Sequence, residues 1–356
     1  MSFIVKRFIL SVIVIACTVA CQCIPLTSSD VLSCQNEMIP IPLEVARLDR
    51  SLAMKDAQTW VLSTIEKGDQ EFESVFFLTQ DGGVSWKCAG HLPVGRSPQI
   101  VYFDFWAETL LLYISFGFAN QSGVLYQSKD LGYSWDMVLT KDLDIRKVFF
   151  WEGGVAWVDN PYYGKPSLFL SEHNGMRWRR FPLTDSLTNH VSFQRNRIMI
   201  LSPRGSIISY NLDTADRDTL YKTSLFIGRD GICSHETIWD FMATDDFAVL
   251  QEGPVAKCMA IDENGLKFRS IIQSREDRTV RIPTALYSHG DTVFVSLRNL
   301  AYHFRQRTLA SIDGGRSWAD LFEGRFDSAC GSSCYSFTKD KDGRVSLRKT
   351  TVRPRE

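Results

Sequence analysis

An eight-residue pattern that recurs along the chain limits what the chain can fold into. Its third position falls at 81, 130, 173, 263 and 313, so successive copies are separated by 49, 43, 90 and 50 residues. The interval of 90 residues is two periods, which predicts a degenerate copy within 210–221. Repeats of about 40 to 50 residues indicate propeller blades or arrays of similar units. The copies are TQDGGVSW at 79–86, SKDLGYSW at 128–135, SEHNGMRW at 171–178, IDENGLKF at 261–268 and SIDGGRSW at 311–318.

Each octet has the residues of a turn between two β-strands. A Ser or Thr at the first position offers a hydroxyl to the backbone, and an Asp at the third position accepts hydrogen bonds from its own turn. A Gly at the fifth position adopts the positive φ that other residues resist, and the Trp at the eighth position covers the turn and the neighbouring sheet layer. We therefore assign structural roles to Thr79, Asp81, Gly83, Trp86, Ser128, Asp130, Gly132, Trp135, Ser171, Gly175, Trp178, Ser311, Asp313, Gly315 and Trp318.

The octet resembles the Asp box, or bacterial neuraminidase repeat, S/T-x-D-x-G-x-x-W. Three copies match it in full and two in part, and they span residues 79–318. The resemblance implies an all-β fold, a β-propeller of four-stranded blades with the box on a peripheral turn of each blade. Six turn positions imply at least six blades. The terminal segment 335–352, with a strand from before the first octet, predicts a seventh, so seven blades are preferred over six because they close the ring and protect its edges.

The N-terminus carries a targeting pattern. Lys6 and Arg7 precede the short apolar run 8–15, and Ala16 is a small residue before Cys17, which together predict a secretory signal peptide at 1–16. VIAC at 14–17 resembles the lipobox of bacterial lipoproteins and implies acylation of Cys17, with Cys21 as the second candidate. We expect a signal peptide at 1–16, a lipidated linker at 17–40 and one propeller domain at 41–356. The chain would face the periplasm and contact the membrane through its lipid.

The charge and the content of cysteine and histidine indicate which partners, disulfides and metals to expect. Lys and Arg number 40 against 41 Asp and Glu, a formal charge of −1, so nucleic acid is not an expected partner. If Cys17 carries the lipid, eight of nine cysteines remain, an even number that permits disulfides in an exported chain. Cys330 and Cys334 form the closest pair, either a disulfide or two free thiols. The six histidines are scattered, so we expect no metal and no cofactor.

An enzyme is the alternative, because Asp boxes also occur in sialidases. The resemblance would imply an exo-sialidase type of glycoside hydrolase, with an arginine cluster, a tyrosine nucleophile assisted by a glutamate, and an acid aspartate. VRIPTAL at 280–286 contains Arg-Ile-Pro, which makes Arg281 a candidate for the first arginine. It follows four octets, however, whereas the motif precedes the boxes in sialidases. No further member of the set is assignable, so no catalytic residue is predicted.

One basic stretch, MRWRRF at 176–181, is a candidate binding patch. Arg177 and Arg179 would share one strand face opposite Trp178, and Arg180 would lie on the Trp178 face. Such arginines suit a carboxylate, a lipid phosphate or an acidic protein, although solvated charges are also usual at a propeller rim.

These features favour a non-catalytic protein-binding propeller at the bacterial cell envelope. The resemblance allows two roles: an immunity protein that neutralises a secreted effector of the type VI lipase kind, or an assembly factor for a membrane complex, as in photosystem II assembly and stability factors. The connections between octets are expected to carry the specificity.

Overall fold

The structure is a computed structural model, and every regular element in the residues that it describes is a β-strand. The expected signal peptide at 1–16 and the two candidate lipidation sites, Cys17 and Cys21, lie outside those residues. The described ranges are 32–42, 50–68, 71–95, 98–106, 108–116, 122–141, 145–151, 154–159, 167–171, 179–181, 191–194, 196–202, 206–222, 225–227, 233–235, 238–252, 255–262, 265–272, 281–299, 306–342 and 344–354. Across these ranges no helix is long and apolar enough to cross a membrane.

Within the described ranges, the strands form seven antiparallel four-stranded sheets, which we number as blades from the N-terminal side. Blade 1 consists of β2 (Arg50–Met54), β3 (Trp60–Lys67), β4 (Phe72–Thr79) and β5 (Lys87–Gly95). Blade 2 consists of β6 (Pro98–Trp106), β7 (Thr109–Phe116), β8 (Ser122–Ser128) and β9 (Asp136–Lys141). Blade 3 consists of β10 (Ile145–Trp151), β11 (Gly154–Asp159), β12 (Ser167–Ser171) and β13 (Arg179–Arg180).

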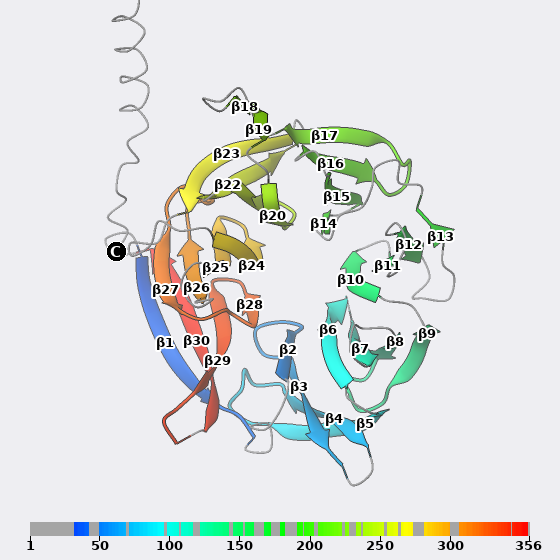
Figure 1. Cartoon of the computed structure of the whole chain (residues 1–356). Coiled ribbons are helices and arrows are strands. Elements are labelled where there is room, and N and C mark those ends of the chain that lie inside the picture. Colours follow the sequence, from blue (N-terminus) through cyan, green and yellow to red (C-terminus); the bar gives the residue numbers. More distant parts are fainter. Residues whose placement is uncertain are drawn as a thin grey trace, which may run out of the picture.

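The remaining blades repeat this arrangement. Blade 4 consists of β14 (Val191–Gln194), β15 (Arg197–Leu201), β16 (Ser206–Asn211) and β17 (Arg217–Lys222). Blade 5 consists of β20 (Ile238–Ala243), β21 (Phe247–Glu252), β22 (Val255–Asp262) and β23 (Gly265–Ile272). Blade 6 consists of β24 (Arg281–His289), β25 (Thr292–Asn299), β26 (Gln306–Ser311) and β27 (Ala319–Glu323). Figure 1 shows the sheets arranged in a ring, with the first strand of each blade nearest the centre. The predicted all-β propeller is confirmed.

The seventh blade is assembled from both ends of the sequence. It consists of β28 (Ser328–Cys330), β29 (Ser333–Lys339), β30 (Val345–Pro354) and β1 (Leu32–Pro40), in that order across the sheet. β1 pairs antiparallel with β30, from Leu32 opposite Pro354 to Pro40 opposite Ser346. The seven-bladed closure is as predicted. The propeller domain, however, begins earlier than the predicted residue 41. Residues 32–40, predicted as part of a linker, form the outer strand of blade 7.

The hydrophobic core lies between the blades. The second and third strands of a blade are covered on both faces, which explains apolar runs such as Val75–Leu78 of β4. Val75 and Phe77 pack toward blade 7 with Tyr335, whereas Phe76 and Leu78 pack toward blade 2 with Leu112.

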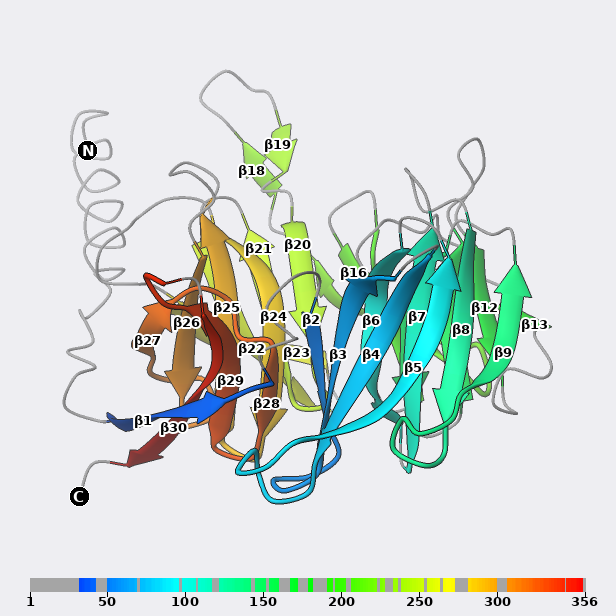
Figure 2. The same ribbon diagram turned by 90° about the horizontal axis from the view of Figure 1, so that it is seen from below.

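An additional hairpin, β18 (Leu225–Ile227) with β19 (Cys233–His235), lies between blades 4 and 5. It projects from the ring on the side away from the turn that joins β4 to β5 (Figure 2).

Candidate functional site

The three complete octets occupy equivalent turns. Those at 79–86, 128–135 and 311–318 join the third and fourth strands of blades 1, 2 and 6. In the first, the Thr79 hydroxyl donates to Oδ1 of Asp81 (2.7 Å) and accepts the N–H of Gly83 (2.9 Å). Ser128 and Ser311 make the same pair of bonds in their own octets. The turn is therefore held by side chains that lie within four residues of one another.

A serine at the seventh position completes each turn, a role not assigned from the sequence. The N–H of Ser85 donates to Oδ1 of Asp81 at 2.9 Å, and its hydroxyl donates to Oδ2. Ser134 and Ser317 repeat both bonds. The signal was present in the sequence, because all three complete octets carry Ser immediately before Trp.

These hydrogen bonds keep the aspartates ionised. The bonds from Ser85 and Thr79 lower the pKa of Asp81 to about 2. Burial by itself would raise the pKa of Asp130 and Asp313, but the serine bonds in their turns outweigh it and the pKa falls below the usual value. A carboxylate saturated by its own turn is a structural group and a poor proton donor.

The glycine at the fifth position makes a close approach to the preceding blade. Gly83, Gly132 and Gly315 have φ of 91°, 93° and 76°. An added Cβ would lie 2.6 Å from Cγ2 of Ile39 at Gly83, and 2.4 Å from Sγ of Cys258 at Gly315. Both the left-handed backbone and the lack of space require glycine here.

The octet tryptophan also packs toward the preceding blade. Trp86 donates its Nε1–H to the carbonyl of Pro40 (3.1 Å), at the end of the blade 7 outer strand. Trp135 lies against Phe76 of blade 1, with ring centroids 4.5 Å apart. Trp318 donates to Oγ of Ser270 in blade 5 (2.9 Å). Each octet thus fastens its own blade to the one before it.

The weaker copies differ from this pattern. The predicted degenerate copy is the turn between β16 and β17, where Asn211 rather than Asp accepts backbone N–H groups. In the copy at 261–268, Phe268 stands in the place of the tryptophan and is 57% exposed. In the copy at 171–178, Ser171 ends β12, and Gly175 and Trp178 lie outside the described residues.

The arginine candidates are only partly brought together. Arg179 and Arg180 form β13 opposite Leu170 and Phe169, and both are exposed. Arg179 Nη2 donates to the carbonyl of Leu212 in blade 4 (3.2 Å), so this side chain links two blades. Arg177 lies outside the described residues.

Arg281 is far in the sequence from that stretch and begins β24, the inner strand of blade 6. Its backbone lies opposite Asn299, and its side chain is not among those described.

Cys330 and Cys334 are free thiols in the structure, so the disulfide considered for them is not present. In the hairpin of β28 and β29, Cys330 lies opposite Ser333 and Cys334 opposite Ala329. Since neighbouring strand residues alternate between faces, the two thiols point to opposite faces of the sheet. Burial raises the pKa of Cys334 to about 12. The described residues include no cluster of His, Cys, Asp or Glu able to hold a metal.

Exposed apolar side chains occur on the neighbouring blades 1 and 2, and we call them, together with Lys87, the rim patch. Val84 (82% exposed) and Tyr133 occupy the sixth positions of the first two octets, and Met137 (61% exposed) follows on β9. Lys87 Nζ lies 5.4 Å from the centroid of the Tyr133 ring and so connects the two blades. The rim patch consists of Val84, Lys87, Tyr133 and Met137.

Comparison with known proteins identifies the fold class. No protein-family model and no curated protein matches the sequence. YCF48 bound to a D1 peptide matches at a TM-score of 0.54 and 13% identity, over 89% of this chain and 94% of that chain. The propeller domain of the Trilobed protease from Pyrococcus furiosus matches at 0.53 and 11% identity (86% and 97% covered). The N-terminal domain of Nup159 matches at 0.51 and 8% (91% and 96% covered). The chain is a β-propeller.

Proposed function

We propose that this chain is a non-catalytic, protein-binding β-propeller of the Asp-box type, and that a partner protein docks on the rim patch. One observation carries the proposal: Val84, Tyr133 and Met137, three of the five large apolar side chains that lie exposed in the described residues, belong to neighbouring blades 1 and 2. Tyrosine and methionine side chains are enriched in protein interfaces relative to the rest of the surface.

The octet chemistry supports a binding role over an enzymatic one. Each aspartate that resembles a catalytic acid is repeated in three blades and is held by its own turn. A group repeated around a ring does not mark one reaction centre. The ring is rigid because its blades are fastened in series, and a rigid surface loses little conformational entropy when a partner binds.

For the partner we propose an envelope protein. A secreted effector of the lipase kind is one candidate, which the chain would neutralise as an immunity protein. A subunit of a membrane complex is the other, with the chain as its assembly factor. YCF48 holds a D1 peptide on a similar fold, which supports the use of such a ring as a peptide-binding scaffold.

The binding proposal is tested with a tagged full chain and a matched surface control. The double variant Tyr133→Ser/Met137→Ser removes the anchor of the rim patch, and Phe268→Ser removes an exposed aromatic ring from blade 5. Capture from an envelope fraction, followed by titration of the captured protein, should give one saturable partner. We expect the double variant to weaken binding by about 2 kcal/mol, roughly 30-fold in Kd, and the control to leave it unchanged. Equal affinity of the two variants would contradict the rim patch as the binding surface.

We also propose export and lipid anchoring through Cys17. Labelling of cells with a palmitate analogue should mark the chain, and Cys17→Ala should abolish the label. Loss of label only with Cys21→Ala would place the modified residue at Cys21.

A further inference from the structure

The two outermost strands of blade 1 place a thiol, an imidazole and a carboxylate in a row on one face of the sheet. Sγ of Cys88 lies 3.6 Å from Nε2 of His91, and Nδ1 of the same ring lies 3.4 Å from Oε2 of Glu73. Cys88 and His91 are on β5, and Glu73 is on the neighbouring strand β4. All three are open to solvent at least in part. Nothing in the binding proposal uses them.

A β-bulge brings the thiol and the ring together. In a regular strand, residues three apart point to opposite faces, so Cys88 and His91 would not meet. Cys88 lies opposite Phe77 and Gly90 lies opposite Phe76, so Ala89 is an extra residue. Beyond the bulge His91 lies opposite Val75, on the same face as Cys88.

The carboxylate reaches the ring from the same face of β4. Glu73 is two residues from Val75, so their side chains share a face of the sheet. The order along that face is therefore Cys88, then His91, then Glu73.

The fold does not require a thiol and an imidazole at these positions, because the same bulge carries other side chains in blades 2 and 6. In blade 2 the equivalent positions are Met137, opposite Tyr126, and Thr140, opposite Val124.

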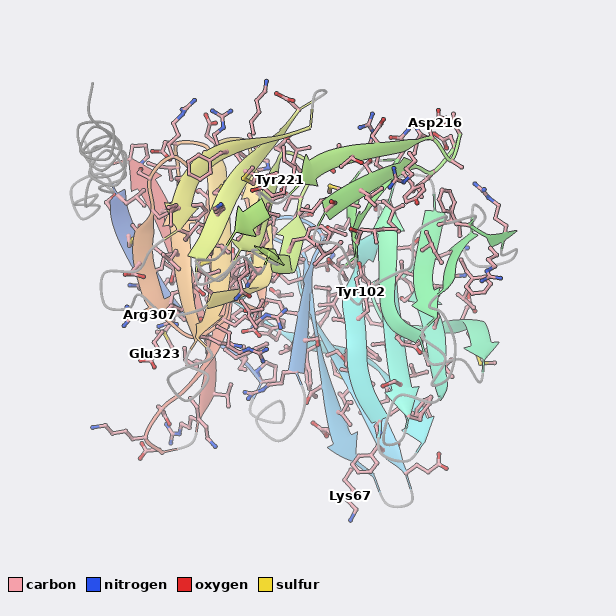
Figure 3. The ribbon with its side chains drawn as sticks, turned by 45° about the horizontal axis from the view of Figure 1, so that its top comes forward. Lys67, Tyr102, Asp216, Tyr221, Arg307 and Glu323 are labelled. Carbon is pink, nitrogen blue, oxygen red and sulfur yellow. The ribbon has the colours of Figure 1, made fainter. Side chains whose placement is uncertain are left out.

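In blade 6 the equivalent positions are Asp320 and Glu323, and Arg307 of the neighbouring strand β26 contacts the first and pairs in register with the second. Arg307 Nη1 is 3.8 Å from Oδ2 of Asp320, and Arg307 is the strand partner of Glu323, beside it in Figure 3. That cluster is an ion pair with no nucleophile. Only blade 1, of these three, combines the bulge with a thiol.

The geometry suits proton transfer rather than metal binding. His91 turns its two nitrogens to two different partners, so the sulfur and the carboxylate oxygen do not converge on one point. In this arrangement the carboxylate accepts the Nδ1–H and orients the ring, which leaves Nε2 to accept the thiol proton.

We propose that Cys88 is a nucleophilic thiol that exchanges with disulfides, with His91 as its base and Glu73 as the residue that positions the ring. The thiol proton passes to His91 Nε2, and the sulfur attacks one sulfur of an incoming disulfide. A new S–S bond forms to Cys88 as the old one breaks, and the departing thiolate takes the proton from His91. One disulfide is consumed and one is formed, so the disulfide itself is the oxidant. The open strand face admits a small-molecule or a peptide disulfide.

The test measures the rate at which Cys88 of the full chain reacts with 4,4′-dithiodipyridine at neutral pH, assigned by mass spectrometry of peptides. His91→Gln should lower the rate at Cys88 about tenfold, and Glu73→Gln should lower it by a smaller factor. The rate at Cys34, an exposed thiol of β1, should stay the same in every variant. His289→Gln, which removes an exposed histidine of blade 6, is the matched control and should change neither rate.

Two further arms separate a chemical role from a structural one and identify the disulfide. Imidazole added to His91→Ala should restore part of the rate at Cys88, which a merely structural histidine would not allow. Oxidised glutathione and a disulfide-bonded peptide, compared as substrates, distinguish the two sources, and faster reaction of either at Cys88 than at Cys34 supports the proposal. An unchanged rate at Cys88 in His91→Gln would overturn it, as would an equal loss at Cys34.

Discussion

The octet blades and the closing blade obtain their outer strands in opposite ways. In blades 1, 2 and 6 the third and fourth strands are joined by an eight-residue turn with its own hydrogen bonds. In blade 7 the third strand is β30 and the fourth is β1, from the other end of the sequence. A local turn forms at little entropic cost, whereas pairing of β1 with β30 requires the whole chain to close into a ring.

The two regions meet at the first octet. Gly83 approaches Ile39 of β1, and Trp86 donates a hydrogen bond to Pro40 at its end. A local turn thereby fastens the least local strand of the molecule. Closure of the ring therefore depends on blade 1 as well as on the β1–β30 pairing.

Removal of β1 should have the largest effect. A chain of residues 41–356 leaves the β30 edge unpaired and exposes the surface that Ile39 covers, at a cost on the order of 5 kcal/mol or more, comparable with the stability of a typical domain. We expect aggregation and a non-cooperative thermal transition. A chain of residues 32–356 is the matched control and should unfold cooperatively. Equal melting curves would show that β1 contributes nothing to closure.

Substitution of Gly83 should have the next largest effect. Gly83→Ala brings a Cβ within 2.6 Å of Ile39 Cγ2 and 2.9 Å of the Trp60 ring at a φ of 91°, so we expect a loss of about 3 kcal/mol. Gly290→Ala has a φ of 56° with no atom within 4 Å of the added carbon, and should cost only about 1 kcal/mol. Denaturant unfolding measures both. If the two variants lost the same free energy of unfolding, the close contact between Gly83 and Ile39 of β1 would not contribute to the loss.

Protonation of the first octet should have the smallest effect. The pKa of Asp81 is lowered in the fold to about 2, from 3.8, so its contribution to stability is complete above about pH 4 and is lost as the pH falls toward about 2. The difference in unfolding midpoint between wild type and Asp81→Asn should shrink across that interval. Asp342→Asn, in an exposed turn of blade 7, removes the same charge and should show no such change. A constant difference for Asp81→Asn would contradict the role of the ionised carboxylate.

Prediction from the sequence succeeded where interactions are local. The octet spacing predicted the blades. The residues of each complete octet are hydrogen-bonded to one another, so an eight-residue sequence is enough to indicate the geometry of its turn. It left Cys330 and Cys334 open between a disulfide and two free thiols, because closeness in sequence says nothing about which face of a hairpin each residue occupies. It did not find the chain of Cys88, His91 and Glu73, because their meeting depends on an extra residue in the pairing of β5 with β4.

The repeating unit of this protein follows from the sequence alone: strands, octet turns and the spacing between them. The tertiary structure decided the closure of the ring by β1, the packing of each octet on the preceding blade, and the bulge that turns Cys88 toward His91. The two differ in how far apart in the sequence the interacting residues lie. Turn geometry follows from φ preferences and hydrogen bonds among near neighbours, whereas strand register and blade contacts exist only once distant segments are side by side.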